Sequence, residues 1–213
     1  MIRASRSEGR LTLALDRPEK ANALTRDMLL GLAEAVEAAA VEAEAGAGDR
    51  VLILTGTGKV FSAGADLDAA KAGLATDPLW ERLSGAIAGF PGLTIAALNG
   101  TLAGGACGMA LACDLRIAVP DATIFYPVMR LGYLPQPSDP ARLAALVGPS
   151  RAKLILMAGA RVGAEEALAW GLIDRIVAPE ALLDEAGRLA ADALAAAPAH
   201  LAAIKAMLRP APE

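Results

Sequence analysis

A glycine-rich segment between two apolar runs constrains this chain most. Residues 99–108 read Asn-Gly-Thr-Leu-Ala-Gly-Gly-Ala-Cys-Gly. The apolar run 93–98 before them predicts a buried strand, and residues 109–113 after them predict a small-residue helix. A glycine turn that opens a helix leaves backbone N–H groups unpaired, and the helix dipole adds positive potential there. The segment is therefore predicted to hold an anion, a phosphate or a developing oxyanion.

The bulk composition predicts a compact cytoplasmic protein. The chain has 213 residues, of which 55% are hydrophobic, and a chain of this length can bury a large core. The longest apolar stretch, residues 102–113, is shorter than the roughly 20 residues that a membrane helix needs. The first residues, Met-Ile-Arg-Ala-Ser-Arg, do not have the apolar centre of a signal peptide. No membrane association is expected.

Charge and rare residues exclude several functions. The net charge is −4 and the chain has three Phe, two Tyr and two Trp, which disfavours a nucleic-acid groove because such a groove needs a positive field and stacking rings. Cys107 and Cys113 lie in apolar sequence and are interpreted as buried thiols rather than a disulfide or metal pair. His200 is the only histidine, so a Ser-His-Asp site, a Cys-His site or a histidine-based metal centre is not expected.

The pattern along the chain predicts an α/β protein with a helical C-terminal part. A second small-residue turn, residues 61–67, is expected to open a short helix, and Thr25 is expected to cap a long one. The remaining expected elements are a hairpin over 1–15, helices over 25–45 and 78–90, strands at 51–54, 115–119, 123–125 and 173–177, irregular chain over 126–140, and helices near 140–147, 150–158, 164–170, 180–197 and 199–208.

Six short stretches occur in an order and spacing that belong to one known family. They are residues 16–24, 61–67, 97–107, 113–114, 131–135 and 164–173. On these the chain resembles the crotonase (enoyl-CoA hydratase/isomerase) superfamily over essentially its whole length. The resemblance implies a spiral of strand-strand-helix units in a single domain, residues 1–213, with a spiral core over 1–148 and a helical part over 149–213.

The resemblance also implies a site for an acyl-coenzyme A thioester. In the family, two backbone N–H groups hold the thioester oxygen, and by motif they fall on Ala65 and Gly105. Pre-oriented N–H groups stabilise an enolate oxygen without reorganising, an effect of about 2.7–4 kcal/mol for one donor in a comparable acyl-transfer site. The alternative is that both turns only allow a helix and a strand to pack closely.

Further residues are implied as contacts to the adenine and ribose-phosphate end of coenzyme A. By motif they are Lys20, Ala21, Ala23, Ala63, Asp66 and Leu67. The alternative for Lys20 is an ordinary solvated lysine in a polar loop. Coenzyme A is expected only as part of the substrate, with no tightly bound cofactor and no metal.

The sequence departs from the family at the acids that hydratases use to place and deprotonate water. The first position is Gly108, three residues after the oxyanion glycine, and the second is Val128, which follows Pro127. Without paired carboxylates the standard water addition has no general acid or base. Ordinary hydratase activity is therefore not expected.

Few residues could replace these acids. Asp139 lies close to where related isomerases carry their acid, but an Asp before Pro140 more commonly caps a helix. Gln136 is the closer positional match and cannot titrate. Tyr126 and Tyr133 could hydrogen-bond a substrate, although core filling is the simpler expectation for each. Glu81 is expected on a solvated helix face.

Two functions therefore stay open. The first is an enzyme that acts on an acyl thioester through an enolate, by isomerisation, decarboxylation, hydrolysis or a narrow hydration. The second is a non-catalytic acyl-CoA-binding or partner subunit. The acidic charge balance disfavours RNA binding, and the wrong glycine spacing disfavours a dinucleotide enzyme.

Family members continue with helices beyond the segment that resembles residues 198–208, and these contribute to a trimer contact. A homotrimer or dimer of trimers is the expected assembly.

Overall fold

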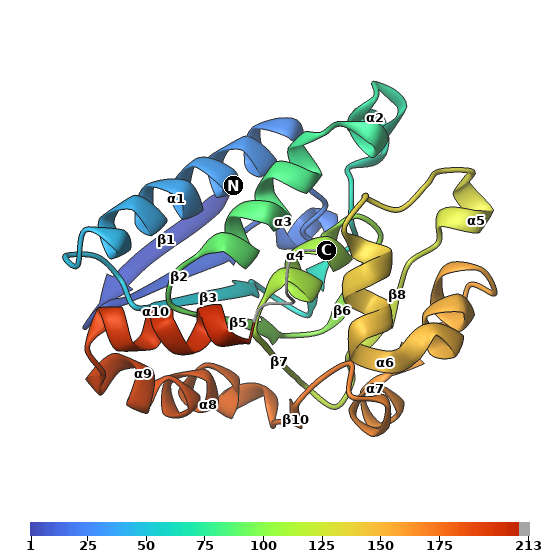
Figure 1. Ribbon diagram of the computed structural model, residues 1–213. Helices are drawn as coiled ribbons and strands as arrows, with labels where there is room; N and C mark the ends of the chain where they lie inside the picture. Colours follow the sequence, from blue (N-terminus) through green and yellow to red (C-terminus); the bar gives the residue numbers. More distant parts are fainter. Residues whose placement is uncertain (209–213) are drawn as a thin grey trace.

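Two β-sheets with helices around them form the part of the molecule that the computed structural model describes, residues 1–208 (Figure 1). The larger sheet has six strands in the order β1-β2-β3-β5-β7-β10. These strands are β1 (Ile2–Ser7), β2 (Arg10–Leu15), β3 (Val51–Gly56), β5 (Leu93–Leu98), β7 (Leu115–Ala118) and β10 (Arg175–Ile176). Only the β1–β2 hairpin is antiparallel, with Ile2 opposite Leu15; the other neighbours are parallel.

The smaller sheet has four strands in the order β4-β6-β8-β9. They are β4 (Val60–Ser62), β6 (Thr101–Ala103), β8 (Thr123–Phe125) and β9 (Val162–Gly163). The first three are parallel to one another, and β9 is antiparallel to β8. Because the carboxyl ends of parallel strands meet at the same edge of a sheet, the turns that follow β4, β6 and β8 are neighbours in space.

The chain alternates between the two sheets as it advances. Strands β3, β5 and β7 each belong to the large sheet, and each is followed by a short strand of the small sheet and then by helix. This is the expected spiral of strand-strand-helix units. Its physical basis is the sequence of the large-sheet strands, which are apolar and almost wholly buried along β3 and β5, as parallel strands between layers must be.

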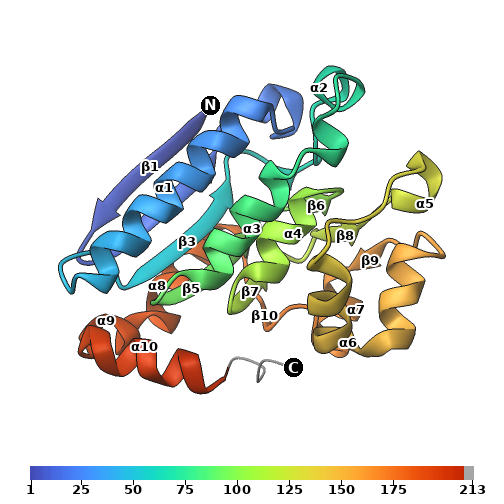
Figure 2. The same ribbon diagram turned by 45° about the horizontal axis from the view of Figure 1, so that its top comes forward.

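Helices cover the large sheet on both faces. Helices α1 (Arg26–Glu44) and α3 (Leu79–Gly89) pack against each other on one face, and α8 (Leu182–Leu189) contacts β5 and β7 on the other (Figures 1 and 2). Thr25 caps α1 as expected, because its hydroxyl accepts a hydrogen bond of 3.3 Å from the Met28 N–H. The remaining helices are α2 (Leu67–Lys71), α4 (Ala106–Ala112), α5 (Val128–Leu131), α6 (Asp139–Leu156), α7 (Ala164–Trp170), α9 (Ala191–Ala195) and α10 (Pro198–Met207), with single 3₁₀ turns at Pro18–Lys20, Leu74–Thr76 and Pro179–Ala181.

The C-terminal half differs from the expected elements in three places. The segment 126–140, expected to be irregular, contains the short helix α5. The expected helix over 180–197 is broken into a 3₁₀ turn, α8 and α9. Helix α6 runs through both expected helices near 140–147 and 150–158, but Gly148 has φ 80° and ψ 160°, so the expected interruption is present as a kink before Pro149.

Other expectations concern composition rather than elements. Cys107 and Cys113 are both free and buried, as predicted. Burial raises the pKa of the Cys113 thiol to about 12 and that of Cys107 well above its ordinary value, so both behave as small apolar side chains. Among residues 1–208, no helix is both long enough and apolar enough to cross a membrane.

Candidate functional site

A cavity of about 310 Å³ opens where the turns after β4, β6 and β8 meet. We call it the turn cavity. Parallel sheets commonly bind ligands outside the carboxyl ends of their strands. Its wall is formed by Ala63, Ala65, Leu67, Ala70, Lys71, Ala75, Trp80, Gly104, Gly105, Tyr126, Pro127, Val128, Leu131, Tyr133, Leu134 and Gln136. Lys71 is the one ionisable cation or carboxylate among these residues, so the wall is predominantly apolar.

The Ala65 N–H points away from Leu24, the residue with which Ala65 forms a β-bridge. Leu24 forms a parallel bridge with Ala65, in which the Leu24 N–H donates to Gly64 O at 2.8 Å and the Asp66 N–H donates to Leu24 O at 2.9 Å. Successive N–H groups of an extended segment alternate in direction, so the Ala65 N–H points to the opposite side. It has no acceptor within residues 1–208, and Ala65 lines the turn cavity.

The Gly105 N–H is unpaired for a different reason. Gly105 precedes the first residue of α4, and the first N–H groups of a helix have no partner within it. The Gly104 N–H donates to Phe125 O at 3.2 Å and Gly104 O accepts from the Cys107 N–H at 2.9 Å, whereas the Gly105 N–H has no acceptor in the described residues. Gly105 also lines the turn cavity.

Two glycines allow these turns to approach each other. Gly64 has φ +92° and Gly104 has φ +59°, the left-handed region that side chains disfavour. A Cβ atom on Gly64 would lie 2.9 Å from the carbonyl oxygen of Ala103, and one on Gly104 would lie 3.6 Å from the Gly64 Cα. The close packing that was the alternative explanation of the turns is thus real, and it brings the two unpaired donors to one cavity.

The residues expected to contact coenzyme A divide into two groups. Ala63 and Leu67 line the turn cavity together with Ala65. Lys20, Ala21, Ala23 and Asp66 are not part of its wall. Lys20 is exposed in the Pro18–Lys20 turn, which also fits a solvated lysine.

Asp66 has two structural partners. Its carboxylate accepts from the N–H groups of Asp68 and Ala69, which caps α2, and forms a 2.7 Å ion pair with Arg17. The hydrogen bond from Arg17 lowers the pKa of the Asp66 carboxyl. Asp66 therefore fixes the loop after residue 15 to the turn that follows β4.

Asn22 was not singled out from the sequence, yet it organises the same loop. Its side-chain amide donates to the carbonyl oxygens of Thr57 at 2.9 Å and Val60 at 2.7 Å, and its side-chain oxygen accepts from the Arg17 N–H. The Ser62 hydroxyl donates to Asn22 O at 2.8 Å. Asn22 is fully buried with φ +53°. An Asn in a polar loop was the available signal, because Asn tolerates this conformation better than most residues.

Asp139 does not cap α6, so that expectation is wrong. It is the first residue of the helix, is fully buried, and its Oδ2 accepts a 2.9 Å hydrogen bond from the Tyr126 hydroxyl. Burial raises the pKa of the Asp139 carboxyl to about 6, although the bond from Tyr126 and the charge of Arg142 oppose the rise. Burial also raises the pKa of Tyr126, which stays protonated.

The Asp139 carboxylate lies against Gly108. A Cβ atom on Gly108 would lie 2.8 Å from Asp139 Oδ1 and 3.0 Å from Oδ2. From the sequence, the missing acid at position 108 and the acid at position 139 are separate observations. A contact between residues 31 positions apart leaves no local sequence pattern, so their proximity could not be predicted. In space, the carboxylate of α6 occupies the volume next to Gly108.

Glu81 and Tyr133 also differ from expectation. Glu81 is partly buried rather than solvated, and its carboxylate accepts hydrogen bonds from the Ser138 N–H and hydroxyl. Glu81 thus ties α3 to the start of α6, beside Asp139. Tyr133 does not fill the core: it is 38% exposed and lies in the cavity wall. Tyr126, by contrast, is buried as expected.

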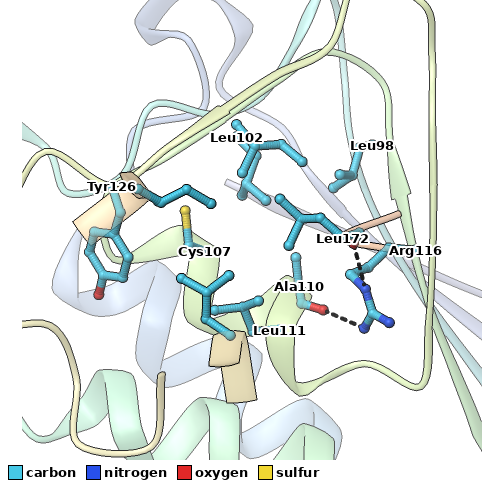
Figure 3. A pocket seen from close by; sticks show the side chains of 11 residues that line it. Leu98, Leu102, Cys107, Ala110, Leu111, Arg116, Tyr126 and Leu172 are labelled. Carbon is cyan, nitrogen blue, oxygen red and sulfur yellow. Dashed lines mark hydrogen bonds between the residues drawn. The ribbon is translucent and has the colours of Figure 1, made fainter. Parts of the chain in front are cut away.

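A second cavity near Tyr126 is too small for a substrate. It has a volume of about 20 Å³, and Cys107, Leu98, Leu102 and Leu172 are among the side chains around it (Figure 3). This is room for about one water molecule. The guanidinium of Arg116 at its edge already donates to the carbonyl oxygens of Cys113 and Leu172. The turn cavity, whose wall contains both residues with an unpaired N–H group, is the candidate active site.

A spiral of strand-strand-helix units, with an apolar cavity where the turns of the small sheet meet, defines a class of protein, the crotonase fold. A profile of the enoyl-CoA hydratase/isomerase family matches residues 5–212. The chain belongs to the enoyl-CoA hydratase/isomerase family.

Individual relatives agree with this assignment. Carnitinyl-CoA dehydratase of Salmonella arizonae is 37% identical over 218 aligned positions, which cover 98% of this chain and 80% of the relative. The structure of an enoyl-CoA hydratase from Bacillus anthracis superposes with a TM-score of 0.88 at 30% identity, covering 96% of this chain and 80% of the other. Pseudomonas aeruginosa DspI gives a TM-score of 0.88 at 32% identity, covering 97% and 85%.

Proposed function

We propose that this protein binds an acyl-CoA thioester in the turn cavity and stabilises its enolate with the backbone N–H groups of Ala65 and Gly105. One observation carries the proposal: two donors without acceptors in the described residues belong to turns that pack together and line one apolar cavity. Donors held by the main chain need no reorganisation as negative charge develops on the thioester oxygen. Two relatives are named for CoA thioesters, a carnitinyl-CoA dehydratase and an enoyl-CoA hydratase, and these names support the same substrate class.

The acyl group that fits this wall is uncharged and largely apolar. Leu67, Leu131 and Leu134 are exposed at 78%, 57% and 85% and surround the cavity together with Tyr133. An acyl chain that covers these side chains removes apolar surface from water, worth about 25 cal/mol per Å².

The reaction we propose is a proton transfer at the carbon next to the thioester, as in isomerisation, with Asp139 as the ionisable group. Its carboxyl has a pKa of about 6, close to the value that suits a general acid–base at neutral pH. Gly108 and Val128 occupy the positions that the family resemblance gives to the two hydratase glutamates. Hydration by a glutamate pair is therefore not proposed.

Calorimetric titration with acetoacetyl-CoA, beside free coenzyme A, tests the proposal. Acetoacetyl-CoA enolises readily, so an oxyanion site should bind it at least tenfold more tightly than coenzyme A. Equal affinities would refute the oxyanion role of Ala65 and Gly105. Light scattering on the same sample tests the proposed homotrimer or dimer of trimers, which the family resemblance alone supports.

A non-catalytic acyl-CoA-binding subunit is the second candidate, and the full burial of Asp139 favours it. Such a protein would show the same preference for acetoacetyl-CoA but would exchange no protons of a bound acyl group.

A further inference from the structure

We propose that the Tyr126 hydroxyl, rather than the Asp139 carboxylate, contacts the reacting carbon, and that Asp139 exchanges protons with the substrate through Tyr126. The inference deepens the proposed function and rests on it. Tyr126 would be the catalytic residue. Asp139 would be a buried positioning residue that orients the Tyr126 hydroxyl proton and accepts it.

Access to the cavity distinguishes the two residues. Tyr126 belongs to the wall of the turn cavity, whereas Asp139 is fully buried and does not belong to it. The Tyr126 hydroxyl donates to Asp139 Oδ2 at 2.9 Å and accepts a long hydrogen bond of 3.4 Å from the N–H of Gln136, another wall residue. A proton that a bound substrate gives to this hydroxyl can be passed on to the carboxylate, because the two groups share a hydrogen bond.

The same tyrosine separates the two cavities. Its ring lies beside Cys107 at the edge of the small cavity, and its hydroxyl is directed away from Leu98 and Leu172 (Figure 3). The hydroxyl therefore meets the carboxylate of Asp139 on the side away from these apolar side chains.

Helix α4 relates this pair to the oxyanion donors. Gly105 immediately precedes α4 and Gly108 is its third residue, so the two lie within one helical turn of each other. Gly105 carries the unpaired N–H, and Gly108 is the residue against which the Asp139 carboxylate lies. The tyrosine–carboxylate pair thus lies against α4 within about one helical turn of the residue that carries the oxyanion donor.

The carboxylate retains a free acceptor. Asp139 Oδ1 is buried and has no hydrogen-bond partner within residues 1–208. The titratable and charged groups that face Asp139 are Tyr126, Cys107 on α4, Glu81 on α3 and Arg142 on α6. Burial is the largest influence on the Asp139 pKa, Arg142 favours its ionised form, and Glu81 disfavours it. No other described side chain donates a hydrogen bond to the carboxylate, so Tyr126 is its route to the cavity.

The transfer balances without any added reactant. A C–H bond next to the thioester breaks, its proton moves to the Tyr126 oxygen, and the Tyr126 proton moves to Asp139 Oδ2. The electron pair of the C–H bond becomes the enolate, whose charge lies on the thioester oxygen at Ala65 and Gly105. The reverse transfer returns a proton to carbon, either at the same position or, in an unsaturated acyl group, at another.

Exchange of the C2 protons of butanoyl-CoA in D₂O, followed by NMR, tests the relay. Tyr126→Phe keeps the ring, and Asp139→Asn keeps an acceptor for the Tyr126 hydroxyl. We expect each to retain acetoacetyl-CoA affinity within threefold and to lower the exchange rate by 10²-fold or more. The wild-type rate should rise as pH increases through about 6, and Asp139→Asn should abolish this rise. A merely structural role would not change the pH profile.

A matched control removes a buried hydroxyl outside the cavity. Thr55, on β3, donates to Ala97 O at 2.9 Å, so Thr55→Val loses a comparable bond and should exchange at the wild-type rate. Should Asp139→Asn fail to fold, Asp139→Ser serves in its place, and circular dichroism checks each variant.

Each other result overturns the relay in an identifiable way. Wild-type exchange by Tyr126→Phe, with loss only in Asp139→Asn, would mean that the carboxylate reaches the substrate directly. No exchange by the wild type, with acetoacetyl-CoA still preferred, would overturn the relay and leave oxyanion binding intact. Loss of that preference as well would refute the proposed function itself.

Discussion

At the scale of single residues, Gly108 and Asp139 depend on each other. The Asp139 carboxylate fills the space that a Gly108 side chain would need, and its position is fixed by Tyr126. An alanine at 108 must displace the carboxylate, because contacts under 3 Å to a Cβ atom do not persist. The glycine is therefore required by the acid on α6.

The variant Gly108→Ala tests this dependence. Alanine normally stabilises a helix by about 1 kcal/mol relative to glycine, but here we expect a net loss of about 1–3 kcal/mol from overpacking, measured by urea denaturation. In an Asp139→Gly background the same change should be stabilising. Gly85→Ala on α3, where an added Cβ meets no atom within 4 Å, is the control. Additive effects of the changes at 108 and 139 would contradict the coupling.

The ionisation of Asp139 should also be visible in stability. Its pKa is raised from 3.8 to about 6 in the folded protein, so the folded state binds the proton more tightly than the unfolded chain. The free energy of unfolding should therefore fall as pH rises from about 4 to about 6, by about 3 kcal/mol in total. Asp139→Asn cannot ionise, and its stability relative to the wild type should increase over that range in denaturation curves. A pH-independent difference would refute the assignment.

At the scale of elements, the three turns at the end of the small sheet form the site because β4, β6 and β8 are parallel neighbours. In the proposed site, each turn has a separate task. The first supplies the Ala65 N–H, the second supplies the Gly105 N–H, and the chain after β8 supplies Tyr126. The packing of Gly64 against Gly104 sets the spacing of the donors.

Gly64→Ala should disturb that spacing. The left-handed backbone costs a side chain about 1–2 kcal/mol, and the new Cβ would lie 2.9 Å from Ala103 O. We expect loss of stability together with a tenfold or greater loss of acetoacetyl-CoA affinity by calorimetry. Gly159→Ala, with φ +69° and no atom within 4 Å of its Cβ, should lose stability alone. Equal affinities of the two variants would show that the Gly64 contact does not position the donors.

At the scale of the whole molecule, the sequence predicted what is local or periodic. The hairpin, the Thr25 cap and the strand-turn-helix order all follow from neighbouring residues. The order of the six motifs allowed the fold to be predicted from the family resemblance. It could not predict that Asp139 meets Gly108, that Glu81 reaches Ser138, or that Asn22 bonds to Thr57, because each contact joins positions far apart. Asp139 shows the limit: its local sequence favours a cap, and tertiary burial assigned it another partner.

The use of main-chain donors has a practical consequence for how such a site can be detected. Position 65 is already alanine and position 105 has no side chain, so an alanine scan would pass over both without a signal. Only a change to the backbone, such as replacing one of these amides by an ester, removes a donor while leaving every side chain in place. The half of the site that would hold the developing charge is therefore invisible to the usual mutational survey.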